Sequence, residues 1–169
     1  MDATHFHLAL THFPIVGTLI GAGILGFGLF FKNDALKKSA LILFILMGII
    51  TIPVFLTGEG AEETVENFAG ISENIIETHE NLAKITIWFM GALGIISMIS
   101  LFAMVKKLSM SRILVLLTFI VSLATMGLFL KVGNTGGQIR HAEIRSNTTV
   151  QQGEGNNGAK ESRDMDDDD

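Results

Sequence analysis

Long stretches without an Asp, Glu, Lys or Arg side chain divide this chain into membrane-sized segments. A helix needs about 20 consecutive, predominantly apolar residues to cross the hydrocarbon core of a bilayer. Four uncharged stretches reach or approach that length, namely residues 3–31, 39–58, 85–105 and 113–130. The pattern predicts an all-α integral membrane protein whose spans form an up-down four-helix bundle.

The short connections between these stretches predict the orientation. The connections after the first and third stretches carry basic side chains: Lys32, Lys37, Lys38, Lys106, Lys107 and Arg112. Because short basic loops stay on the cytoplasmic side of a membrane, both termini are expected outside. No Lys or Arg precedes the first stretch, which is also much longer than the about 7–15 apolar residues of a signal peptide, so it is expected to remain as a span.

Local spacing predicts further elements. The acidic connection over residues 59–84 is expected outside, with a short extra helix over residues 61–68 and a longer helix that begins after Ser72 and enters the third span. On a helical wheel His79 lies opposite the neighbouring glutamates and is expected to face apolar packing. Glu80 is expected to pair with Lys84, four residues later. Residues 133–137, Gly-Asn-Thr-Gly-Gly, predict a turn after the fourth span.

Glycines in the first span predict a close helix contact. Gly17, Gly21 and Gly28 share one face, the small-residue stripe that lets a neighbouring helix approach closely in lipid. No internal repeat is apparent in the chain beyond the pairing of two helical hairpins.

Composition agrees with a membrane location and excludes several classes of function. Of 169 residues, 49% are hydrophobic and 17% charged, and the mean hydropathy is +0.48. A net charge of −5 with scattered basic residues excludes a nucleic-acid-binding protein. The absence of cysteine excludes disulfides, thiolate metal sites, iron–sulfur clusters and covalent haem attachment. Residues 1–145 are predicted to form the membrane domain, and residues 146–169 a disordered acidic tail.

Histidines are the main candidates for chemistry, because all five fall on the predicted outer side. Three of them are candidate ligands of a cofactor: His7, His12 and His79. His12 lies inside the first uncharged stretch, where ionisable groups are usually functional. For a divalent transition metal, the same side offers four further candidate ligands: His141, Glu59, Glu62 and Glu63. The three glutamates could instead orient the imidazoles through hydrogen bonds. Polar side chains also collect at a wet interface without binding anything, and this explanation is favoured for His5 and His141.

One run resembles a known family. His7-Leu8-Ala9-Leu10-Thr11-His12-Phe13-Pro14-Ile15 is similar to the opening His-x4-His-Phe-Pro signature of a family of uncharacterised four-helix bacterial membrane proteins. Later pieces follow the order of that family, over roughly residues 5–144: Pro53 with Leu56-Thr57-Gly58, His79, and a Gly-Gly pair followed by a histidine. Relatives commonly have Pro where this chain has Leu8. The resemblance implies a four-helix fold in the bacterial inner membrane. The association of relatives with respiratory-type cytochromes points to haem or electron transfer.

The sequence leaves two classes of function open. The first is a histidine-rich extracytoplasmic site that binds b-type haem or a divalent transition metal for electron transfer, with other membrane or respiratory-chain proteins as partners. The second is a structural or assembly subunit of a membrane complex without a cofactor. A cation transporter is disfavoured because no acidic or basic residue lies deep in a span. Hydrolysis is disfavoured because no serine or threonine has an identifiable base, and nothing in the sequence indicates another enzyme.

Overall fold

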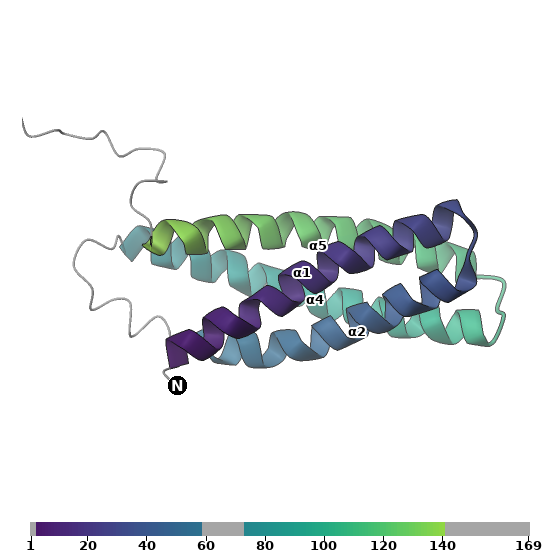
Figure 1. Cartoon of the computed structure of the whole chain (residues 1–169), viewed down its shortest axis with the longest axis horizontal. Coiled ribbons are helices and arrows are strands. Elements are labelled where there is room, and N and C mark those ends of the chain that lie inside the picture. The colour runs from purple at the N-terminus through teal and green to yellow at the C-terminus, as the bar shows by residue number, and fades with distance from the viewer. Residues whose placement is uncertain (1–2, 59–72, 141–169) are drawn as a thin grey trace, which may run out of the picture.

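The computed structural model describes residues 3–58 and 73–140. This part of the chain forms four helices that lie along one another in a single bundle (Figure 1): α1 (Ala3–Phe30), α2 (Asp34–Leu56), α4 (Glu73–Val105) and α5 (Ser111–Arg140). It contains no strand, and the predicted all-α four-helix bundle is confirmed. The expected helix over residues 61–68 and tail over 146–169 lie outside the described residues, as do Glu59, Glu62, Glu63 and His141.

The two basic connections are tight turns of the same kind. At the end of α1 the N–H groups of Lys32 and Asn33 donate to the carbonyls of Leu29 and Gly28, at 3.3 and 2.9 Å. The end of α4 repeats these bonds around Lys107, and both lysines have a φ of 53°. This left-handed residue with its paired bonds satisfies the last carbonyls of a helix and reverses the chain. The expected hairpins therefore close at these lysines.

Each helix packs against two neighbours, which places α1 and α4 on one diagonal of the bundle. α1 packs against α2 and α5, and α4 packs against the same two helices. The glycine stripe of α1 faces α2 as predicted, since a Cβ added at Gly21 would lie 2.6 Å from Cε1 of Phe44. Gly17 likewise faces Met47 of α2. The hairpin of α1 and α2 is therefore held by a close helix contact.

Hydroxyl groups lie among the apolar side chains of the core, and most of them bond within their own helix. Thr51 and Thr125 donate to carbonyls four residues earlier, at 2.7 and 2.8 Å. Ser100 and Thr118 pair at 2.8 Å between α4 and α5. Such bonding makes polar groups tolerable inside a membrane bundle, where no water replaces a missing partner.

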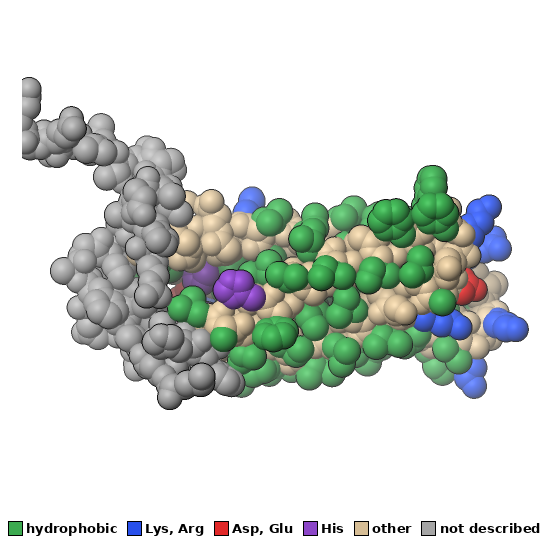
Figure 2. Space-filling model, viewed as in Figure 1, with side chains coloured by type: hydrophobic (Ala, Val, Ile, Leu, Met, Phe, Trp, Pro, Cys, Tyr) green, Lys and Arg blue, Asp and Glu red, His purple; other side chains and the backbone are tan. Residues whose placement is uncertain are grey.

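The outer surface of the bundle is apolar along its length. Figure 2 shows a hydrophobic band between one end rich in Lys and Arg and the other end, where the histidines lie. All four helices are long and apolar enough to cross a membrane. The chain is therefore a multi-pass membrane protein. We call the end with the turns at Lys32 and Lys107 the lysine end, and the end with His7 and His79 the histidine end.

Two local expectations on α4 and α5 have different outcomes. Glu80 and Lys84 form the predicted ion pair, at 2.6 Å. The predicted turn over residues 133–137 is wrong, because α5 continues unbroken to Arg140. Three glycines weaken a helix in isolation, but contacts with a neighbouring helix can override that preference. The contact that involves Gly136 belongs to the site described next.

Candidate functional site

His7 joins the beginning of α1 to the end of α2. Its half-buried ring places Nδ1 3.0 Å from the carbonyl oxygen of Val54 and 3.2 Å from Oγ1 of Thr57. The Thr57 hydroxyl in turn donates to the same Val54 carbonyl, at 3.0 Å. One carbonyl and one hydroxyl at the end of α2 therefore fix the orientation of this imidazole.

His79 makes the corresponding contact between α4 and α5. Its ring is half-buried, as the helical wheel predicted, and Nδ1 lies 3.0 Å from Oγ1 of Thr135. Thr135 donates to the Val132 carbonyl at 3.0 Å. Each ring therefore bonds through Nδ1 to a threonine hydroxyl that also donates to the valine carbonyl three residues earlier.

A short repeated sequence produces this match. The sequence Val-x-x-Thr-Gly occurs at the end of α2, residues 54–58, and within α5, residues 132–136. Each ring lies beside the glycine: a Cβ added at Gly136 would be tight, at 3.2 Å from Cε1 of His79, whereas one at Gly58 would make an ordinary contact, at 3.6 Å from Cε1 of His7. No internal repeat was expected from the sequence, because this five-residue motif was not considered. The bundle consists of two hairpins that each hold one histidine in the same way.

The hydrogen bonds also decide which ring nitrogen is available. The Val54 carbonyl can only accept, and the Thr135 hydroxyl already donates its proton to a carbonyl, so Nδ1 of each ring carries the proton and Nε2 of the neutral ring keeps its lone pair. Within the described part of the chain, neither Nε2 has a hydrogen-bond partner. Neither Nε2 is among the fully buried polar atoms that lack a partner in the described residues, so both nitrogens are accessible. Metal-binding histidines are oriented in this manner, with the other N–H donated to a carbonyl.

The two rings come from diagonal helices at the same end of the bundle. α1 and α4 share both of their neighbours, and each ring is held by the neighbour that completes its own hairpin. Both rings therefore lie at the end of the bundle opposite the basic turns.

The structure does not bring His12 to this pair. Its side chain is exposed, and its Nδ1 donates to the Leu8 carbonyl of its own helix, at 2.7 Å. Over residues 3–58 and 73–140, no group of three or more His, Asp or Glu side chains could hold a metal ion. Of the three candidate ligands, His7 and His79 each bond to a neighbouring helix at the same end of the bundle, and His12 does not.

Comparison with known proteins adds no further assignment. The chain matches no protein-family model, no curated protein and no solved structure. The resemblance carried by residues 7–15 therefore remains a hypothesis from the sequence.

Proposed function

We propose that this membrane protein binds a redox cofactor between His7 and His79, and that the cofactor is b-type haem. The observation that carries the proposal is the duplicated arrangement of these two histidines. Each imidazole is bonded through Nδ1 to a threonine hydroxyl, His7 is bonded to the Val54 carbonyl as well, and each ring keeps Nε2 without a partner in the described structure. His7 and His79, on diagonal helices, would hold the haem through these two nitrogens.

The number of ligands favours haem over a bare metal ion. Zinc usually takes four ligands, of which at least three come from the protein. The described residues offer two imidazoles and no third group in reach. A haem iron already has four nitrogen ligands from its own ring and needs only axial ligands from the chain. A divalent transition metal would require further ligands from the remaining candidates, His141, Glu59, Glu62 and Glu63.

Electron transfer is the activity that follows from two protein ligands. A haem held by two histidines would supply the protein with a carrier of single electrons. His7 and His79 then hold and orient the cofactor, and Thr57 and Thr135 hold the histidines. We further propose that the protein lies in a bacterial inner membrane with the histidine end outside, as the basic turns indicate, where it meets other membrane or respiratory-chain proteins.

The test of this proposal compares three asparagine variants of the purified protein. His7→Asn and His79→Asn keep a side-chain N–H near the position of Nδ1 but remove Nε2. His12→Asn is the matched control, since His12 is exposed and bonded within its own helix. We expect haem absorption in the wild type and in His12→Asn, and its loss or strong reduction in the other two variants. Equal haem content in all four proteins would overturn the assignment of the ligands.

A second function is favoured by the same hydrogen bonds. His7 is hydrogen-bonded to the end of α2, and His79 is hydrogen-bonded to α5. Both residues could therefore serve to stabilise the hairpins of a structural subunit that has no cofactor. This alternative predicts a colourless protein without bound metal. It also predicts that the asparagine variants retain the stability of the wild type, because they preserve the donor.

A further inference from the structure

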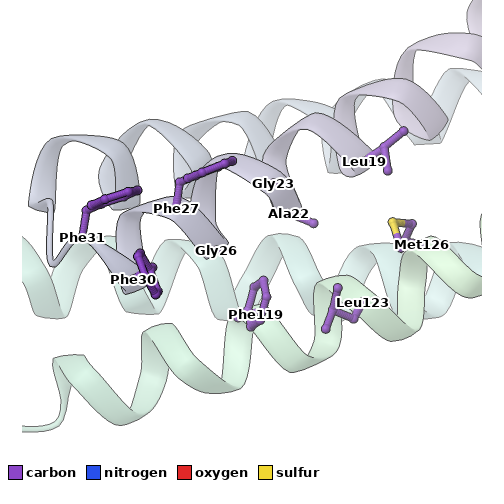
Figure 3. Close-up of a pocket in the computed structure, with 10 residues that line it drawn as sticks. All are labelled: Leu19, Ala22, Gly23, Gly26, Phe27, Phe30, Phe31, Phe119, Leu123 and Met126. Atoms are coloured by element: carbon purple, nitrogen blue, oxygen red, sulfur yellow. The ribbon is translucent and has the colours of Figure 1, made fainter.

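An apolar groove runs between α1 and α5 in the half of the bundle near the lysine end. Its volume is about 570 Å³, which is within the range of about 300–1,000 Å³ of small-ligand sites. Side chains of both helices line it (Figure 3), including Phe27 and Phe30 of α1 and Phe119 and Leu123 of α5. All of its lining side chains are apolar, and they belong to two helices that are long enough to cross a membrane.

Loose packing between these two helices and a missing side chain keep the groove open. Of the four pairs of neighbouring helices, α1 and α5 have the least extensive contact. Gly23 forms part of the wall, and a Cβ added there would meet nothing within 4 Å. A larger residue at this position would fill the groove without displacing its own helix.

Basic side chains lie where the groove reaches the lysine end. Phe31, at the edge of the groove, directly precedes Lys32. Arg112 lies two helical turns before Phe119, on the same side of α5. It is the second residue of α5, which begins at the same end of the bundle as the α1–α2 turn (Figure 1). Asp34, at the beginning of α2, is paired with Lys37, at 2.8 Å. The region at the mouth of the groove is therefore positively charged.

We propose that this groove binds one anionic phospholipid. An acyl chain occupies the apolar groove beside Gly23, and the phosphate group contacts Arg112 and Lys32. The groove is apolar, and cations lie at its lysine end. The cations favour an anionic lipid over a neutral one. They also favour a lipid over a partner helix, which needs no phosphate contact. If the lysine end faces the cytoplasm, the site lies in the leaflet that attracts basic segments to anionic lipids. The proposal is independent of any cofactor at the histidine end.

The test measures lipid retention by native mass spectrometry after reconstitution with phosphatidylglycerol and phosphatidylcholine. Gly23→Leu fills the groove, and Gly91→Leu is its control, because a Cβ at Gly91 of α4 also meets nothing within 4 Å. We expect the wild type and Gly91→Leu to retain one phosphatidylglycerol in preference to phosphatidylcholine, and Gly23→Leu to lose it.

Charge variants test the headgroup contact separately. Arg112→Gln should weaken retention about fivefold, as expected for one basic residue near an anionic surface. Lys131→Gln, an exposed lysine near the histidine end, should not change it. Three results would overturn the proposal: equal retention by Gly23→Leu and Gly91→Leu, no preference for phosphatidylglycerol, or a dimer that Gly23→Leu abolishes, since a second copy would then occupy the groove.

Discussion

At the scale of single residues, the site depends on which histidine nitrogen is held. His7 and His12 lie five positions apart on one helix, yet only His7 reaches a neighbouring helix, where Val54 and Thr57 accept its Nδ1–H. The sequence placed both histidines at the correct end. It could not separate them, because the direction of α1 relative to α2 decides which side of α1 is covered.

The threonine partners should affect the cofactor without touching it. Thr135→Val keeps the shape of the side chain but removes the hydroxyl beside His79 Nδ1. Loss of such an orienting bond typically costs about 10–100-fold in metal affinity. We expect faster loss of haem to a scavenging protein, measured by absorption, than in the wild type. Thr78→Val is the control, since that exposed hydroxyl bonds only to Asn74 of its own helix; equal rates in both variants would show that Thr135 does not position His79.

At the scale of helices, a group of glycines can mark either a close contact between helices or a turn, and the sequence alone did not distinguish the two. The glycines of α1 were correctly assigned to a close contact, because their spacing matched one helix face. The glycines after residue 132 were assigned to a turn, yet α5 continues through them. Within α5, Gly136 lies against the ring of His79, whose Cε1 is 3.2 Å from an added Cβ. That contact comes from α4, which is distant in sequence.

A methyl group added at the contact of α1 and α2 should destabilise the bundle. Gly21→Ala would place its Cβ 2.6 Å from Phe44, a fully buried ring that has little room to move. Overpacking of this kind costs about 1–3 kcal/mol. The thermal unfolding midpoint in detergent should fall for Gly21→Ala but not for Gly127→Ala, where an added Cβ meets nothing within 4 Å. An unchanged midpoint for Gly21→Ala would contradict the close contact.

At the scale of the whole molecule, two similar hairpins form one bundle. Basic turns lie at one end of this bundle, and histidines lie at the other. Charge spacing was enough to predict the four spans, their order and the separation of basic turns from histidines. The relation between the hairpins was missed, because Val-x-x-Thr-Gly is short and the surrounding apolar residues differ. Only the packed structure shows that both copies hold a histidine.

The orientation in the membrane can be tested on a chain that has no cysteine of its own. Asn74 is exposed near the histidine end, and Ser109 is exposed at the lysine end. With Asn74→Cys and Ser109→Cys, an impermeant maleimide should label position 74 in intact spheroplasts and position 109 only after the membrane is opened. The reverse pattern would place the histidine end in the cytoplasm.

The central claim is that His7 and His79 bind the same iron. The most direct measurement is electron paramagnetic resonance of the oxidised, haem-loaded protein. We predict a low-spin signal with two imidazole ligands in the wild type and in His12→Asn. Either His7→Asn or His79→Asn should convert any remaining haem to a high-spin form. A low-spin bis-imidazole signal that survives in both of these variants, or a purified protein that takes up no haem, would contradict the account.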